Sequence, residues 1–352
     1  MNKRGIKMGK KRTKWMSFIV VAAAFTGFIG DTSVSKSHVQ ASSYKNGSIT
    51  IPAKNGTICG APNYIAYEKG FFKKNGLKAD IVAKPANIGD LEAGFTNGKY
   101  DVLNGDFQYL PAIQNGAQIL AAGGLHQGCI QVLVPKNSSI HSVKDLKGKS
   151  IGTPGQGSTG QYVATIALQH AKIDPKTGVT WKTYDFDLLA KATEKGQVDA
   201  ISTVDPYAYQ AVKEDHFRVI ADNNNSSNSD KMAKMGMKKS GSCCYLYLSE
   251  KVVKEDPKKA AAIVKSYKEA AQWIDKHPAA TADILLDKKY VAKTSFVDKK
   301  NVTALIKSYH FSLKHGSGKA DLKYYAKELK KAGFLKSNTN VNKLVTDAYY
   351  QK

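Results

Sequence analysis

Hydrophobic and polar positions follow two different periods along the chain from residue 48 onward. Short runs such as 48–53 alternate and are rich in β-branched residues, which is typical of β-strands. Segments such as 158–171 repeat apolar residues every three or four positions, which is typical of α-helices. The two patterns alternate regularly. This alternation predicts an α/β fold in which helices cover both faces of a parallel or mixed sheet.

Residues 57–76 connect the first predicted strand to a helix through a tight turn. Tyr64, Tyr67 and Phe71 fall on one helical stripe, and Pro62 stands where a first helical turn tolerates proline. Such a turn aims backbone N–H groups at the space above the strand end. We therefore expect one wall of a binding site here.

A polar stretch after residue 136 divides the alternating pattern into two series of elements. The second series extends to about residue 239, and the apolar segment 240–248 predicts a strand that returns to the first series. Amphipathic helical segments then make up the remaining tail. We therefore predict one lobe from residues 42–136 and 240–352, and a second lobe from residues 137–239.

The first 41 residues have the pattern of an export signal. Seven lysines and arginines precede an apolar run over 15–30, and small residues end at Ala41. This run is shorter than the roughly 20 residues of a membrane-spanning helix. We predict cleavage near Ala41 and an exported product that is extracellular or associated with the cell envelope.

The chain is strongly basic, with a formal net charge of +24. Its lysines are spread over helix faces, and no arginine-rich run with interleaved aromatic residues occurs, so nucleic acid is not an expected partner. A cationic exported surface instead fits contact with an anionic cell envelope.

The glycine-rich segment 155–161 is a second candidate binding element. Ser158 and Gln161 have the spacing of a helix capping box, and the glycines allow a ligand to approach the backbone. No Gly-Lys-Ser/Thr sequence follows, so the segment is not a nucleotide-binding P-loop. An ordinary capped helix after a strand explains the same residues.

Several short motifs follow one another in a fixed order: AP at 61–62, EKGFFKKNGL at 68–77, GKYDV at 98–102, VKDLKGK at 143–149, GQVDA at 196–200 and DPY at 205–207. This order resembles the sulfonate/nitrate/taurine-type solute-binding proteins of ABC importers, over residues 48–275. The resemblance implies a two-lobed periplasmic-binding-protein-like fold of type II, with two interlobe crossings and a helical C-terminal tail. It also implies a small ligand, captured between the lobes and delivered to an importer permease and ATPase.

The resemblance implies a set of ligand-binding residues in the cleft: Pro62, Asn63, Asp106, Ser158, Thr159, Asp205 and residues 241–244. In a closing cleft, Asp106 and Asp205 would accept hydrogen bonds from a cationic or polar ligand. Sulfonate binders of this type usually carry tryptophan before the Asp-Pro-Tyr motif, and Val204 stands there in this chain, which argues against a sulfonate.

Four cysteines and one histidine form the remaining candidate site. Cys59 lies in the first cleft turn, Cys129 follows a loop that contains His126, and Cys243 and Cys244 lie where the chain returns to the first lobe. Thiolates and imidazole suit a soft metal ion such as Cu(I) or Zn(II), or an iron–sulfur cluster. The vicinal pair distantly resembles the iron-associated cysteine motif of fungal thiamine-pyrimidine synthases, which share the fold.

Three alternatives remain at this point. Cys59 and Cys129 could form a disulfide, as is usual in an oxidising compartment, and the pocket would then bind an organic or anionic solute through Ser158, Thr159 and backbone N–H groups. Vicinal cysteines in a strand point to opposite faces, so one of them could belong to the core. An enzyme of the thiamine-precursor type is the third alternative. We expect a binding protein and no enzyme, since no paired catalytic residues occur in a recognisable order.

Overall fold

The computed structural model describes residues 44–351, except 55, 86–87, 224–240 and 315. The predicted export signal and its cleavage position lie outside the described residues. Residues 42–352 form one compact unit. Within the part of the chain that the structure describes, we find no helix with the length and apolar character needed to cross a membrane.

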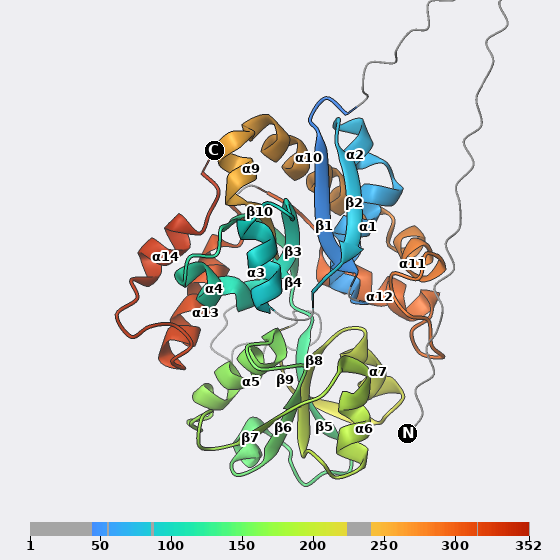
Figure 1. The fold of residues 1–352 in the computed structure, drawn as a ribbon. Helices are drawn as coiled ribbons and strands as arrows, with labels where there is room; N and C mark the ends of the chain where they lie inside the picture. The colour runs from blue at the N-terminus through green and yellow to red at the C-terminus, as the bar shows by residue number, and fades with distance from the viewer. Residues whose placement is uncertain (1–43, 55, 86–87, 224–240, 315, 352) are drawn as a thin grey trace, which may run out of the picture. The chain divides into compact units, whose positions relative to one another are not determined.

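The strands of the described residues form sheets of two, three and five strands (Figure 1). In spatial order they are β1 (Ser48–Lys54) and β2 (Lys78–Ala83); then β3 (Val102–Asp106), β10 (Ser242–Ser249) and β4 (Ile119–Gln127); then β7 (Thr180–Thr183), β6 (Ser150–Thr153), β8 (Ala200–Val204), β5 (Ile130–Pro135) and β9 (Phe217–Asp222). The first sheet is parallel, the second antiparallel and the third mixed. The alternating pattern predicted a parallel or mixed sheet, and the structure contains one of each.

The helices follow the predicted order closely. They are α1 (Ala61–Glu68), α2 (Phe71–Lys74), α3 (Ile88–Thr96), α4 (Leu110–Gln114), α5 (Thr159–His170), α6 (Leu189–Glu194), α7 (Tyr207–Lys213), α9 (Glu250–Glu255), α10 (Pro257–Lys276), α11 (Pro278–Asp287), α12 (Lys299–Tyr309), α13 (Lys319–Lys331) and α14 (Val341–Asp347). The tail from α9 onward is helical, as predicted, and α13 packs beside β10.

Sequence position alone misplaced one strand. The prediction left residues up to 136 in the first lobe, but β5 pairs with β8 and β9 in the five-stranded sheet. The chain therefore passes from one sheet to the other between Gln127 and Ile130. The sequence of a short apolar strand does not indicate which sheet the strand joins, because its pairing partners lie far away in the sequence. The division into two lobes itself stays a prediction.

The helix predicted after the first turn is interrupted. Gly70 has φ +70°, a left-handed conformation that ends α1 and starts α2 on a new axis. The predicted stripe also fails within α1 itself: Tyr64 is fully buried and stacks on Tyr290 with 4.0 Å between ring centroids, whereas Tyr67 is 47 % exposed. Glycine permits this conformation without a Cβ clash, so it allows the break.

Candidate functional site

A cavity of about 620 Å³ lies between the end of β3 and the start of α5. Its lining comes from elements of both larger sheets and from the loops around them: Thr57, Cys59, Lys84, Pro85, Gly89, Leu91, Asp106, Gln108, Tyr109, Pro154–Gln156, Ser158–Gly160, Phe186 and Val204. Four of the predicted site residues therefore line this one cavity: Cys59, Asp106, Ser158 and Thr159. The structure brings them together from three separate parts of the chain.

The first turn of α5 forms one wall of this cavity. Ser158 is the N-cap, and its Oγ accepts a hydrogen bond of 3.3 Å from the backbone N–H of Gln161. The Gln161 side chain in turn accepts a hydrogen bond of 2.6 Å from the backbone N–H of Gly157. The predicted capping residues thus act together, although the return bond goes to Gly157 and not to Ser158 itself. The positive end of a twelve-residue helix faces the cavity.

Asp106 at the end of β3 forms the facing wall. Its Oδ1 accepts a hydrogen bond of 2.7 Å from the backbone N–H of Gln108, and Thr159 also hydrogen-bonds to its carboxylate. The Thr159 hydroxyl lies 3.3 Å from Oε1 of Gln108. Burial raises the pKa of Asp106, and these hydrogen bonds partly oppose that rise. Thr159 therefore joins the helix to the end of the neighbouring sheet across the cavity.

Lys84 is a site residue that the sequence reasoning missed. Its ammonium group lies 5.7 Å from the centroid of the Tyr109 ring. Burial lowers the pKa of Lys84, but Tyr109 and Asp106 outweigh burial and raise this pKa above its ordinary value. A lysine directly after a predicted strand and before a proline was the available signal. The cavity thus combines a fixed cation, a carboxyl group and a helix N-terminus.

Three other predicted ligand residues lie outside the lining of this cavity. Pro62 and Asn63 are buried in α1, where Oδ1 of Asn63 accepts a hydrogen bond of 2.5 Å from the Tyr267 hydroxyl. Asp205 is fully buried. It accepts hydrogen bonds of 2.9 Å from the Tyr309 hydroxyl and 3.0 Å from the backbone N–H of Tyr209. Burial raises the pKa of Asp205 to about 7, against the effect of these two hydrogen bonds.

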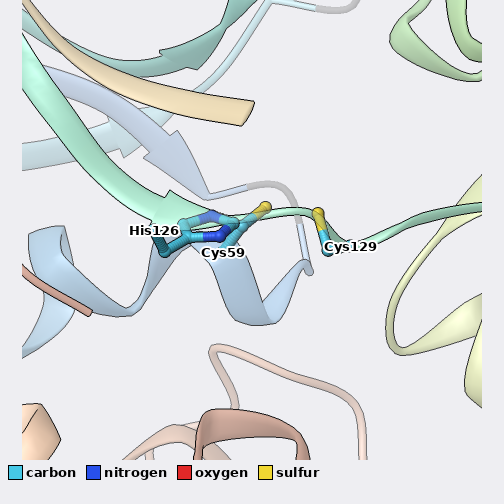
Figure 2. Close-up of side chains that lie close together, drawn as sticks. All are labelled: Cys59, His126 and Cys129. Atoms are coloured by element: carbon cyan, nitrogen blue, oxygen red, sulfur yellow. The ribbon is translucent and has the colours of Figure 1, made fainter. Parts of the chain in front are cut away.

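The four cysteines and His126 form a second group, here named the thiol cluster. Ligand atoms of Cys59, His126 and Cys129 all lie within 4.8 Å of one another (Figure 2). Those of His126, Cys243 and Cys244 form a second group within the same distance. The Sγ of Cys243 lies 3.9 Å from that of Cys129, 3.8 Å from that of Cys244 and 3.9 Å from Nδ1 of His126. These residues come from the first turn, from β4, from the β4–β5 connection and from β10.

All four cysteines are free thiols. The disulfide between Cys59 and Cys129, one of the alternatives left by the sequence, is therefore not formed. Both thiols instead lie among the other donors of the cluster. Burial opposes ionisation of Cys243, but hydrogen bonds with Cys129 and Cys244 outweigh burial and lower the pKa of the Cys243 thiol to about 6. The same hydrogen bond raises the pKa of Cys129 to about 12.

His126 is held in one orientation by its surroundings. Its Nδ1 lies 2.6 Å from the Gln127 carbonyl oxygen, and its ring lies 5.1 Å from the rings of both Tyr309 and Phe311. A carbonyl can only accept, so Nδ1 carries the proton and donates it. Nε2 therefore holds a lone pair. It is buried and has no hydrogen-bond partner among the described residues.

Comparison with solved structures identifies the fold. The alkanesulfonate-binding protein SsuA of Xanthomonas axonopodis pv. citri superposes with a TM-score of 0.67 at 15 % identity, covering 87 % of this chain and 98 % of that one. The fold is therefore that of periplasmic binding proteins, as the resemblance implied. At this identity the likeness shows the fold alone.

Sequence relatives agree with this fold. YtlA of Bacillus subtilis, a candidate binding protein, is 26 % identical over 223 residues, which cover 62 % of this chain and 64 % of that protein. A 4-amino-5-hydroxymethyl-2-methylpyrimidine phosphate synthase of Aspergillus parasiticus is 24 % identical over 250 residues, covering 66 % of this chain and 68 % of that protein. The family described as NMT1/THI5 like matches residues 60–281. The motif resemblance is thereby confirmed, and the chain belongs to the NMT1/THI5-like family.

Proposed function

We propose that this protein is the solute-binding component of an ABC importer and captures a small organic solute with an anionic group. The carrying observation is the cavity of about 620 Å³ in which Lys84 and the N-terminus of α5 lie together. Cavities for small ligands commonly range from about 300 to 1,000 Å³. The volume therefore suits a small solute.

The walls of the cavity support capture by closure. Asp106 and Tyr109 follow β3 of the three-stranded sheet, whereas Ser158, Phe186 and Val204 belong to segments around the five-stranded sheet. A hinge movement that separates the two sheets would open the cavity, and a ligand that contacts both walls would favour closure. The hydrogen bonds of Thr159 to Asp106 and Gln108 are the contacts that such an opening would break.

The charges in the cavity support the ligand class. Lys84 and the positive end of α5 favour an anionic group. Asp106 would accept a hydrogen bond from a donor elsewhere on the same ligand. Val204 at the cavity wall leaves room where a tryptophan would narrow it. A soft metal ion held by the thiol cluster is the other ligand class that we retain.

The importer role also implies where the protein acts and which proteins it contacts. The protein would be exported, act outside the cytoplasm or at the cell envelope, and deliver its ligand to a permease and an ATPase. The name of the Xanthomonas structure, an alkanesulfonate-binding protein, supports a small anionic ligand. The basic surface would favour contact with the anionic envelope.

A ligand-binding measurement tests the proposal. Purified protein is screened by calorimetry and thermal shift against small carboxylates, phosphates, nitrate and zwitterionic solutes. Lys84→Met should weaken binding of any hit at least about tenfold, because it removes the cation in the cavity. Lys73→Met, on the exposed surface of α2, is the matched control and should leave binding unchanged. The absence of any hit across the panel would count against the proposal.

The synthase relative favours a second candidate function, that of a thiamine-precursor enzyme. Incubation with pyrimidine precursors and iron, followed by mass spectrometry, separates the two functions. Formation of a pyrimidine phosphate in more than stoichiometric amount would replace the importer proposal. We propose that no turnover occurs.

A further inference from the structure

We propose that the thiol cluster binds a single thiophilic metal ion of closed-shell type, Cu(I) or Zn(II). This inference goes beyond solute capture in the neighbouring cavity and is tested separately from it. The ligands would be drawn from two groups of donors that share His126: Cys59, His126 and Cys129, and His126, Cys243 and Cys244. They are soft or borderline ligands, which select these ions over Mg²⁺ and Ca²⁺.

The spacing of the donors fits one ion. In a tetrahedral site with metal–sulfur bonds of about 2.3 Å, two ligand sulfurs lie about 3.8 Å apart. The sulfur of Cys243 lies 3.9 Å from that of Cys129 and 3.8 Å from that of Cys244. Cys243 therefore lies at the distance of a fellow ligand from each of these two sulfurs.

The same spacing argues against the iron–sulfur alternative. A cluster places several irons and bridging sulfides between its cysteine ligands, so thiolates on different irons lie farther apart than two ligands of one ion. It also argues against a bond between these sulfurs, because a disulfide joins them at about 2.05 Å. Separated thiols at coordination distance are the arrangement that a single ion requires.

His126 provides an independent observation that points to a ligand. Its Nδ1 donates to the Gln127 carbonyl, so Nε2 presents a lone pair. His126 is 2 % exposed, and in the part of the chain that the structure describes Nε2 has no hydrogen-bond partner. A buried acceptor without a partner is unfavourable, and a metal ion would satisfy it. A backbone carbonyl on the other ring nitrogen is the usual way in which a metal-binding histidine is held.

Burial also indicates how an ion would reach the site. Cys129, Cys243 and Cys244 are buried, whereas Cys59 is half-buried and lines the cavity. Cys59 thus forms the boundary between the cavity and the thiol cluster, and an ion would enter past it. Once bound, a cation would compensate thiolate charge that is costly to bury alone.

Metal titration of the purified protein under reducing, oxygen-free conditions is the test. Zn²⁺ and Cu⁺ are titrated separately in competition with chelators, and Co²⁺ serves as a spectroscopic probe of thiolate coordination. We expect one ion per chain, thiolate-to-Co²⁺ charge-transfer absorption, and proton release on Zn²⁺ binding, because thiols must lose their protons to coordinate. The two titrations distinguish Cu(I) from Zn(II).

Two variants make the test specific. Cys243→Ser removes the sulfur nearest to both other thiols and should weaken Zn²⁺ binding at least about 100-fold, with loss of charge-transfer intensity. His126→Gln should weaken it at least about tenfold. His141→Gln, in an exposed position, is the matched control and should bind as the parent does. Circular dichroism and urea unfolding of each variant without metal show whether the fold is retained.

A stoichiometry below one half, a Co²⁺ spectrum without thiolate absorption, or folded variants that bind like the parent would each overturn the proposal. Rapid formation of a Cys129–Cys243 disulfide in place of metal binding would overturn it as well. Solute binding in the cavity is measured on the same samples without metal. Failure of metal binding with solute binding intact therefore leaves the importer proposal standing, and the reverse result leaves the metal site standing.

Discussion

Replacement of Asp205 by asparagine should change how stability depends on pH. Asp205 is fully buried, and burial raises the pKa of its carboxyl from the ordinary 3.8 to about 7. A difference of about three pKa units between the folded and unfolded states corresponds to about 4 kcal/mol of unfolding free energy. Asparagine has nearly the same shape and cannot ionise, so Asp205→Asn removes this contribution.

The sign follows from proton binding in the two states. Between about pH 4 and pH 7 the folded state keeps the Asp205 proton, whereas the unfolded chain has lost it. The contribution of Asp205 is thus fully present below the unfolded pKa and is lost as the pH rises through the folded value. Subtracting the variant from the parent should give a stability difference that falls by about 4 kcal/mol over this window.

Urea unfolding at a series of pH values, followed by circular dichroism, measures this difference. Tyr309→Phe is an informative companion, since its hydroxyl donates to Asp205 and holds the pKa down. Its removal should extend the window to higher pH. Asp174→Asn is the control of opposite sign, because hydrogen bonds lower the pKa of this exposed carboxylate.

A parent-minus-variant difference that stays flat between pH 4 and pH 7 would refute the reasoning for Asp205. It would mean that the carboxyl ionises in the folded state as easily as in the unfolded chain. A difference that rises with pH would mean that the two hydrogen bonds, and not burial, dominate at this position.

Three further predictions concern stability near the site and use urea unfolding at neutral pH. Ser158→Ala should lower the free energy of unfolding by about 1 kcal/mol, because the N-cap hydrogen bond of α5 is lost. Ser158→Asp should retain most of this stability, since aspartate can also cap a helix. Equal decreases in the two variants would exclude a capping role. Gly160→Ala should cost about 1–3 kcal/mol, since its Cβ would lie 2.4 Å from the Ser202 carbonyl oxygen; an unchanged midpoint would contradict this close packing. Tyr325→Leu should lower the free energy of unfolding by about 1 kcal/mol more than the loss of buried apolar surface explains, because Tyr325 stacks on Phe107 with 3.6 Å between ring centroids. A decrease no larger than that of Tyr324→Leu would argue against a contribution from this stack.

Local chemistry made several features predictable from the sequence. The strand from Ser48, the N-cap at Ser158 and the helical tail depend on residues within a few positions of one another, so their patterns are legible in the chain itself. The ordered motifs likewise indicated the fold, and they pointed to Asp106 and Thr159, which line the cavity. The four cysteines could be singled out because they are rare, soft donors in this chain.

Other features were decided only when distant segments met. Three of them depend on contacts between remote residues or on loop paths that no local pattern encodes: the partner sheet of β5, the burial of Asp205 under Tyr309, 104 residues away, and the position of Lys84 over Tyr109. Whether Cys59 bonds to Cys129 or joins a larger donor set also depends on three-dimensional spacing, which the sequence order does not contain. The sequence by itself determined the elements, the family and the donor types. Only the tertiary structure decided which donors lie together, because packing and hydrogen bonding between remote segments set those distances.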